Sequence, residues 1–520
     1  MALASRDDPA PPGDASALAG PSYGEGFSEA RARKFAAWAK LLEHPPPDEV
    51  RGTLELRCTT TLGVHMVAKR RFESGELLIS ERPVLRLDVH SETFVRDFES
   101  VYGSQTGFLL PAVSVDWEHT SQEALQASLE LFYAHALMQE GPMVDNHKAV
   151  VSRLMESQSR LKERFDVCSL IRFLHVVDLN IHKDEEQTHQ PSRAGIFVFG
   201  SKFTHSCEPN SSWSFDEAGN LQYRACRTVD PGDILTFSYI GNGMNLLGTT
   251  LTRRSRLAAL WFVCQCERCK GPDLVRQLIC PRCGASRCLP CYEDAAAAAR
   301  DWTGDAPLQN CVRDAQRWRC GACEATCSRS ELPLDTEREL NNLVPEMMQW
   351  GIEVLSEQSI DKNWRHCQRA ARVLGKRHCT WAFFVFAWLQ KWLMTVRTQP
   401  VLALPMTTLR KASAELAQFF AESCPRNAEQ RLSALFLTAR LASLLGGSLR
   451  DWGYDPEDPL ADGGSGAQEL SRHGWRCTVS SVDGPDEIPW KLLGRAGSSS
   501  GRRAPPLPPH MRMLYQGAWR

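Results

Sequence analysis

Hydrophobic and polar residues follow several different periodicities along this chain of 520 residues. Between residues 54 and 87, apolar residues partly alternate with polar ones, and the turn segment ESGE at 73–76 separates two runs, which predicts short β-strands. Apolar spacings of three and four predict helices over 122–139 and 148–177. Strand patterns return after Gly195 in IFVFGSKF, WSF, LQYRACRTV and DILTFSYI. Strands on both sides of a helical insert, at about 120–190, indicate one α+β domain over residues 51–245.

The rest of the chain divides into a cysteine-rich part and a helical part. Residues 264–327 have little periodicity, so metal is expected to replace a hydrophobic core there, in two pieces at 246–272 and 273–330. Helical spacing dominates 331–450, and paired helices over 350–397 and 407–445 fit an all-α, tetratricopeptide-like stack. Composition favours a partly disordered extension at 1–50 and a flexible tail at 451–520.

The overall charge narrows the class of partner. Lys and Arg number 60 and Asp and Glu number 62, which leaves a net charge of −2 and no general basic excess. Nucleic acid is therefore not expected to be the main partner. A local basic patch stays open as an alternative, carried by Arg276, Arg282, Arg287, Arg317 and Arg319.

The hydropathy of the chain gives no sign of a membrane segment. The first residues contain no apolar run, and the apolar stretch at 381–394 is interrupted by Gln390 and Lys391. That stretch is also too short to span a bilayer. We expect a soluble intracellular protein, cytoplasmic or nuclear, with no membrane partner. His182 and His189 lie in a polar connection and are expected to be solvated.

Many of the nineteen cysteines are spaced as metal ligands. The segment CQCERC places Cys264, Cys266 and Cys269 together, and three thiolates need a fourth ligand because structural zinc is tetrahedral. A second set, CPRC and CGAC, is typical of a zinc ribbon closed over an inserted loop. We assign its ligands to Cys280, Cys283, Cys320 and Cys323, and Cys288, Cys291 and Cys327 remain alternatives.

Three segments in order carry a family resemblance: FTHSCEPN at 203–210, ILTFSYI at 234–240 and FVCQCERC at 262–269. Together they resemble the second half of a SET domain, in the SMYD-like branch with a CxCxxC post-SET segment. The resemblance covers about 54–272. It implies a β-fold with a pseudoknot, in which the motif strand is threaded by the segment that bears a tyrosine. The paired cysteines of a MYND zinc module are missing between residues 87 and 179, so that module is expected to be absent.

The resemblance also implies a function and its residues. SET proteins transfer a methyl group from S-adenosylmethionine to a lysine of a protein, here a histone or another protein. Tyr239 matches the catalytic tyrosine, and Cys207 is implied as the fourth ligand of the first of two structural zinc ions. The methyl donor is then expected to contact Gly63, His65, Asn180, Thr204, His205, Tyr239 and Phe262.

Two of these positions depart from the family pattern, and two have plain structural alternatives. His65 stands where a second glycine is expected, and Thr204 stands where an asparagine is expected. Asn180 would equally suit a helix cap, and Phe262 would equally suit core packing. The departures motivate an alternative function: a catalytically silent SET-fold scaffold that binds proteins.

Overall fold

The structure of the chain is a computed structural model, and it describes most residues between 48 and 423. The described residues are 48–59, 62–88, 90–118, 120–121, 125, 132, 142–183, 194–241, 246–260, 262–292, 312–348, 357–398, 406–423, 437–438, 441–442, 445, 452, 476–479 and 490–493. The expected extension at 1–50, the tail at 451–520 and the helix over 122–139 lie almost wholly outside the described residues. So does His189.

The strands predicted in the first part of the chain are confirmed. After the short helix α2 (Asp48–Arg51), β1 (Leu54–Thr59) and β2 (Gly63–Ala68) form an antiparallel pair, followed by β3 (Leu77–Glu81) and β4 (Leu85–Leu87). The predicted turn between β2 and β3 contains Gly75, whose φ of 80° lies in the left-handed region that glycine adopts without strain. Gly63, with a φ of 71°, opens β2 in the same way.

The helical insert begins earlier than the sequence pattern indicated. Ser91 caps its first helix, because its side chain accepts the N–H of Phe94 at 3.2 Å. The predicted helix over 148–177 is three helices, since Gln158 and Phe165 leave the helical region of backbone conformation. The described helices of the insert are α3 (Glu92–Tyr102), η2 (Gly103–Gln105), α4 (Thr106–Ser114), α6 (Pro142–Ser157), α7 (Ser159–Arg164) and α8 (Val167–Asn180).

Strands resume after the insert and pair with those before it. The strand expected over IFVFGSKF ends at Ile196, and a 3-10 turn follows at Gly200–Lys202. The elements are β5 (Ile181–Lys183), β6 (Ala194–Ile196), η4 (Gly200–Lys202), β7 (Thr204–His205), β8 (Ser211–Phe215), β9 (Leu221–Ala225) and β10 (Thr236–Phe237). They form sheets in the orders β3-β9-β8 and β4-β6-β5, and β7 pairs with β10 in parallel. Strands before the insert therefore pair with strands after it, as predicted.

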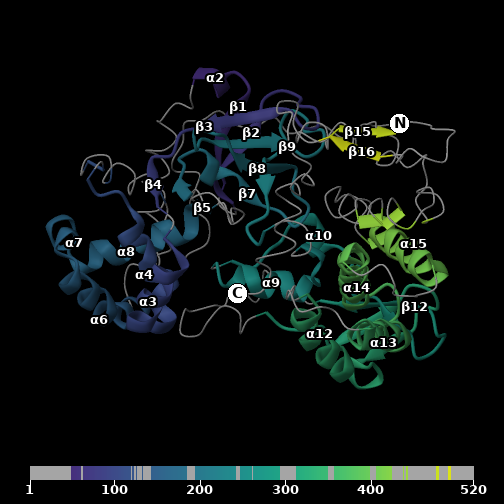
Figure 1. Cartoon of the computed structure of the whole chain (residues 1–520). Coiled ribbons are helices and arrows are strands. Elements are labelled where there is room, and N and C mark those ends of the chain that lie inside the picture. Colours follow the sequence, from purple (N-terminus) through teal and green to yellow (C-terminus); the bar gives the residue numbers. More distant parts are fainter. Residues whose placement is uncertain are drawn as a thin grey trace.

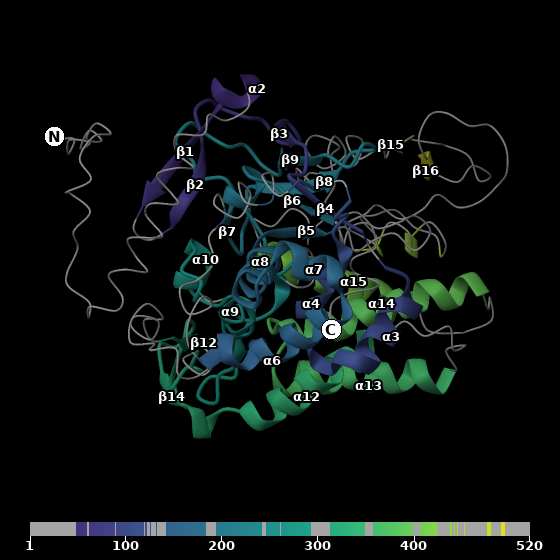
Figure 2. The ribbon, with the colours of Figure 1, turned by 90° about the vertical axis from the view of Figure 1, so that its left-hand side faces the viewer.

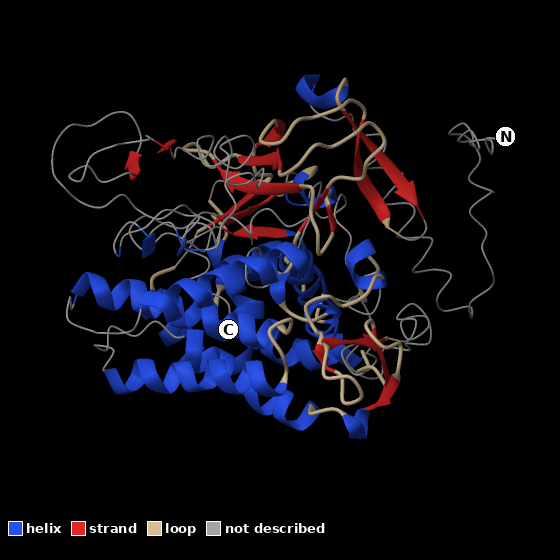
Figure 3. Ribbon diagram, turned by 90° about the vertical axis from the view of Figure 1, so that its right-hand side faces the viewer, coloured by secondary structure: helices blue, strands red, loops and turns tan. Residues whose placement is uncertain are grey.

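Two short helices lead from the last of these strands to a small four-stranded sheet. They are α9 (Thr250–Ala258) and α10 (Glu267–Lys270). The sheet has the antiparallel order β11-β12-β13-β14. Its strands are β11 (Leu278–Ile279), β12 (Ser286–Cys291), β13 (Arg317–Cys320) and β14 (Thr326–Ser328), and η7 (Arg329–Glu331) follows them. Figure 3 shows these strands apart from the main group, beside the helices.

Four long helices build the C-terminal part. They are α12 (Leu334–Met348), α13 (Glu357–Val373), α14 (Cys379–Thr398) and α15 (Met406–Ser423), and α14 contacts the other three. The run Trp381–Leu393 in α14 is buried almost throughout, so its apolar character serves packing. Among the described helices, none combines the length and apolar character needed to cross a membrane. A described hairpin, β15 (Arg476–Val479) with β16 (Trp490–Leu493), lies further along the chain.

The strands and the two groups of helices occupy different parts of the molecule. In Figure 1 the main strands lie above, the insert helices lie below on one side, and the C-terminal helices lie below on the other, with α9 between them. Figure 2, turned by 90°, shows the strands again above the helices. Two large apolar cores match this division. One is formed by residues of the main strands and the insert helices, and the other by residues of the four-stranded sheet and the C-terminal helices.

Candidate active site and cysteine clusters

The parallel pairing of β7 with β10 brings the THSC motif beside the segment that bears Tyr239. The N–H of Thr204 donates to the carbonyl of Leu235 at 3.0 Å. Leu235 in turn donates its N–H to the carbonyl of Met66 at 2.9 Å. Segments from the start of the domain, from the motif and from the tyrosine segment therefore lie side by side, which is the arrangement that a threaded SET fold needs.

Asn210, the last residue of the motif segment, fastens this arrangement. Its Oδ1 accepts the N–H of Thr236 at 2.8 Å, and its Nδ2 donates to the carbonyl of Ile234 at 2.9 Å. The side chain is only 5 % exposed, so these bonds replace those it would make to water. The sequence interpretation gave Asn210 no role, although its place at the end of the motif was visible.

Tyr239 is partly exposed, and its hydroxyl is hydrogen-bonded within the protein. The hydroxyl donates to the carbonyl of Phe203 at 2.8 Å, and the residue as a whole is 36 % exposed. Its backbone N–H donates to Nδ1 of His205 at 3.1 Å. The rings of Phe237 and Phe262 lie 4.8 and 6.0 Å away between centroids. Burial of the hydroxyl raises the pKa of Tyr239 above its ordinary value, so the phenol stays protonated at neutral pH.

The first cysteine cluster consists of Cys207, Cys264, Cys266 and Cys269. Their Sγ atoms all lie within 4.8 Å of one another, and Cys207 lies 3.5 Å from Cys269 and 4.0 Å from Cys264. Four convergent thiols of this kind can hold a metal ion, and tetrahedral sulfur ligation is typical of structural zinc. The cluster joins the motif strand to a segment more than fifty residues later.

Three arginines surround the first cysteine cluster. Arg253 is fully buried and places Nη2 3.7 Å from the Sγ of Cys269. Arg254 donates to the carbonyl of Cys269 at 2.9 Å, and Arg268 donates to the carbonyl of Cys207 at 3.0 Å. A zinc ion with four thiolates carries a net charge of −2, which these cations offset in a buried setting. The sequence interpretation missed them, although TLTRRSRL contains Arg253 and Arg254 shortly before the cysteines and CQCERC itself contains Arg268.

The first cysteine cluster also reaches the aromatic residues around Tyr239. Nε2 of His205 lies 3.3 Å from the Sγ of Cys207, and the His205 and Phe262 rings are 5.9 Å apart. Burial lowers the pKa of His205 to about 4, so its imidazole is neutral. Phe262 packs against the cluster as well. Cysteine positions and the placement of Phe262 beside Tyr239 are therefore connected.

The second cysteine cluster consists of Cys280, Cys283, Cys320 and Cys323. Their Sγ atoms also lie within 4.8 Å of one another, with Cys280 3.8 Å from Cys323 and Cys283 3.7 Å from Cys320. This cluster too can hold a metal ion. The three alternative cysteines differ from one another: Cys288 and Cys327 are buried, and Cys291 is exposed.

Three of the residues expected to bind the donor already make hydrogen bonds within the protein. The His65 ring is 2 % exposed and lies within 2.9 Å of the Gly63 carbonyl through Nδ1. Burial lowers the pKa of His65, so the ring is neutral. Asn180 ends α8 and donates Nδ2 to the carbonyl of Val176 at 2.7 Å, which leaves Oδ1 as an acceptor. Thr204 makes only a long hydroxyl bond, 3.5 Å, to Leu235.

The expectation that His182 is solvated was wrong. The residue is 3 % exposed, its Nε2 lies 2.7 Å from the Tyr223 hydroxyl, and its ring stacks on Phe237 at 5.5 Å. The reason is that β5 carries it into the sheet, opposite Gly195, where it faces the core. Burial lowers its pKa to about 4.

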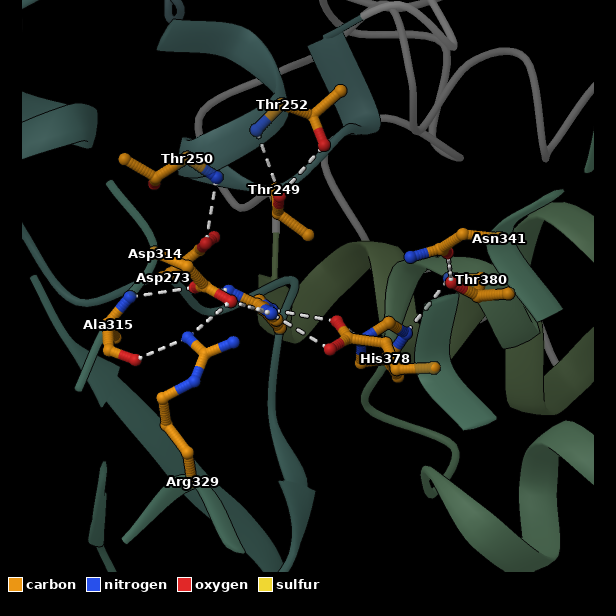
Figure 4. Close-up of polar contacts among 12 residues, drawn as sticks. Thr249, Thr250, Thr252, Asp273, Asp314, Ala315, Arg329, Asn341, His378 and Thr380 are labelled. Atoms are coloured by element: carbon orange, nitrogen blue, oxygen red, sulfur yellow. Dashed lines mark hydrogen bonds and ion pairs between the residues drawn. The ribbon is translucent and has the colours of Figure 1, made fainter. Parts of the chain in front are cut away.

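Arg276, the first residue of the suggested basic patch, is buried. This guanidinium is 4 % exposed and donates to both carboxylate oxygens of Glu337, at 2.7 and 2.8 Å, and to Asp314. His378 approaches the same Glu337 at 2.9 Å, and Figure 4 shows His378 and Asp314 within the surrounding polar network. Arg282 and Arg319 pair with Glu331 and Glu324. Arg276 therefore joins the four-stranded sheet to the C-terminal helices and is not available to a nucleic acid.

A motif strand paired with a tyrosine strand, a helical insert, and cysteines that tie the motif to a later segment together agree with the resemblance to a SET domain. Residues 63–240 match the family model described as SET domain, so the chain carries a SET domain there. Over 212 residues the chain is 24 % identical to a SET domain-containing protein of Acanthamoeba polyphaga mimivirus, covering 41 % of this chain and 75 % of the viral protein.

The comparisons confirm the resemblance to a SET domain and support the function that such domains generally have. SET domains generally belong to lysine methyltransferases, which use S-adenosylmethionine and act on proteins. The SMYD-like branch and the tetratricopeptide-like helical stack remain predictions.

Proposed function

We propose that this protein is an S-adenosylmethionine-dependent protein-lysine methyltransferase with Tyr239 as its catalytic residue. The observation that carries the proposal is the fixed hydroxyl of Tyr239, bonded to the carbonyl of Phe203 at 2.8 Å beside the motif strand. Methyl transfer between a sulfonium and an amine requires the two reactants to be aligned, so positioning is the main task of the protein.

The residues around Tyr239 fit such a donor in part. Oδ1 of Asn180 can accept a hydrogen bond from an ammonium group, and the Thr204 hydroxyl is only weakly engaged. Gly63, His65, His205 and Phe262 complete the proposed donor contacts. When bound, S-adenosylmethionine supplies an electrophilic methyl group.

The chemistry of the lysine follows from the aromatic lining. The attacking amine must be neutral, and the rings of Phe237 and Phe262 give an apolar surrounding that disfavours the ammonium form. Because Tyr239 is protonated, it does not act as a general base. Its hydroxyl oxygen can instead orient the amine and the methyl group.

The finer assignments form part of the same proposal. We place the protein in the SMYD-like branch, with a pseudoknotted SET core over 51–245 and zinc in both cysteine clusters. The C-terminal helices, taken as a tetratricopeptide-like domain, would form one wall of a cleft for a histone or another protein.

The proposal is tested by two measurements on zinc-loaded protein. Titration calorimetry should detect S-adenosylmethionine binding, and radiolabelled donor should label histones or proteins of a cell extract. Tyr239→Phe, which keeps the ring and removes the hydroxyl, should abolish labelling while leaving donor binding within a few-fold. Labelling that persists unchanged in this variant would remove Tyr239 from the mechanism.

A second candidate is the catalytically silent scaffold. The buried imidazole of His65 at a glycine position favours it, as does a cleft of about 360 Å³ between α13, α14 and α15. The cleft is lined by Trp364, Trp381, Lys411 and neighbouring residues, a mixture suited to a peptide. Absence of donor binding at millimolar concentration, with both clusters metal-loaded, would favour the scaffold over the enzyme.

A further inference from the structure

The small sheet β11-β12-β13-β14 gathers additional thiols on its inner face. Cys288 of β12 and Cys320 of β13 are paired across the two strands, and Cys327 of β14 is paired with Trp318. Since alternate residues of a strand point to the same side, all four side chains share one face. Each of the four is 0 % exposed, whereas Arg317 and Arg319 on the other face are exposed.

The two additional thiols lie next to the second cysteine cluster. Cys288 of β12 lies opposite Cys320, a member of that cluster, and Cys327 of β14 lies opposite Trp318, two residues before Cys320. The sequence has a matching pattern, because each CxxC pair is followed by a third cysteine, in CPRCGASRC and in CGACEATC. Two half-sites of three cysteines thus face each other in the folded sheet.

We propose that this sheet binds two zinc ions in a six-thiolate cluster. Cys280 and Cys320 would bridge the ions, because they are the buried member of each CxxC pair, as Cys288 and Cys327 are buried. Cys283 and Cys323 complete the tetrahedral shell of an outer ion. Cys288 and Cys327 complete the shell of an inner ion.

The charge balance allows a second ion at no extra electrostatic cost. The incoming Zn²⁺ forms four zinc–sulfur bonds and displaces the two thiol protons of Cys288 and Cys327. One zinc with four thiolates carries −2, and two zinc ions with six thiolates also carry −2. A buried cluster therefore gains bonds without gaining net charge, whereas two thiols left alone in a core contribute only packing.

The arrangement of the sheet suits such a cluster. The four members of the second cysteine cluster lie within 4.8 Å of one another, and Cys288 and Cys327 lie on the same face of the sheet as Cys320. Binding of the inner ion would draw them inward along the same face. The four inner thiols belong to the core shared with the C-terminal helices, so the inner ion would lie where sheet and helices pack.

The test is the zinc content of the full chain, purified under reducing conditions and measured by mass spectrometry against protein concentration. Cys288→Ser combined with Cys327→Ser should remove about one zinc per chain relative to the unaltered protein. Cys291→Ser, on the same strand but exposed, should remove none. An unchanged zinc content in the double variant would overturn the proposal.

A measurement on the unaltered protein covers the case in which the double variant does not fold. Zinc K-edge absorption should show scattering from a neighbouring zinc together with sulfur-only ligation. Absence of a zinc–zinc contribution in the fully loaded protein would overturn the proposal, and so would a disulfide between Cys288 and Cys327 in the zinc-loaded protein. Neither result would bear on methyl transfer, which is measured separately.

Discussion

The side chain of Asn210 is bonded to Thr236 through its amide oxygen: Oδ1 accepts the N–H of Thr236 at 2.8 Å and its Oγ1 hydroxyl at 3.1 Å. Nδ2 of the same amide donates to the Ile234 carbonyl. The motif strand and the tyrosine strand are each only two residues long. The hydrogen bonds of the Asn210 side chain therefore supplement the few backbone hydrogen bonds that such short strands can form.

Asn210→Ala should destabilise the domain and reduce activity together. The change leaves the Thr236 N–H and the Ile234 carbonyl without their partner, which we expect to cost about 2–4 kcal/mol of unfolding free energy. Urea unfolding gives this number. Asn220→Ala is the control, since that side chain bonds only within its own turn, to Asp216, and should cost about 1 kcal/mol or less. Equal effects of the two changes would contradict the fastening role.

Glu337 and Glu339 provide a matched pair of ion pairs on one helix, α12. Glu337→Gln should cost about 3–5 kcal/mol of unfolding free energy, because buried Arg276 loses half of its compensation. Glu339→Gln removes a solvent-exposed pair with Arg369, so it should change the free energy of unfolding far less than Glu337→Gln does. Thermal unfolding of the two variants at one protein concentration measures the difference. Similar losses would show that the buried network does not join sheet and helices.

Glu81 gives a pH dependence with a definite sign. Its carboxylate accepts the N–H groups of Phe199 and Gly200, but burial raises the pKa of Glu81 from 4.5 to about 7. The folded chain then holds a proton that the unfolded chain releases, so this group's contribution to stability falls as pH rises from about 4.5 to about 7.

Other buried groups must be separated from this effect. His175 and His182, with pKa values lowered by burial to about 4, contribute the opposite slope between about pH 4 and 6.5. Lys202, close to Glu81, has a pKa lowered to about 8 by burial and contributes a rise in stability only above that pH. The difference in unfolding free energy between wild type and Glu81→Gln, measured from pH 5 to 7, therefore isolates Glu81. A difference that does not change with pH would contradict the assignment.

Arg253 should influence metal retention by the first cysteine cluster. Arg253→Met removes the buried cation beside Cys269 and should weaken zinc binding there by about 10- to 100-fold. Competition with a zinc-binding dye measures the affinity of that cluster when the second cysteine cluster is already loaded. Arg317→Met, an exposed change on β13, should have no such effect. Unaltered zinc affinity in Arg253→Met would limit that arginine to packing.

Much of the site could be predicted because its residues form local motifs. THSC, FSY and CQCERC are contiguous, so the placement of Cys207 and Tyr239 needed only the order of three segments. The strands before the insert could be predicted for the same reason, since their alternation is local. The helix after Ser91 could also have been recognised, because Phe94, Phe98 and Tyr102 repeat at helical spacing after a capping serine.

Other features depend on contacts between distant residues and could not be predicted. The burial of His182 depends on β5 pairing with β6 across a connection of ten residues, and polar neighbours along the chain gave the opposite impression. The ion pairs of Arg276 join residues 61 and 38 positions apart. From the sequence alone, an arginine near a cysteine segment could equally lie on an exposed basic surface or in a buried ion pair.

The link between Cys207 and Cys269 sets an order for biosynthesis. The two residues are 62 positions apart, so a nascent chain that has delivered the whole of residues 63–240 still lacks three of the four thiols of the first cysteine cluster. Tyr239 leaves the ribosome before the segment that places Phe262 beside it. The first cysteine cluster can therefore form only after translation has proceeded well past residue 240, and a metal ion could be held there only from that point.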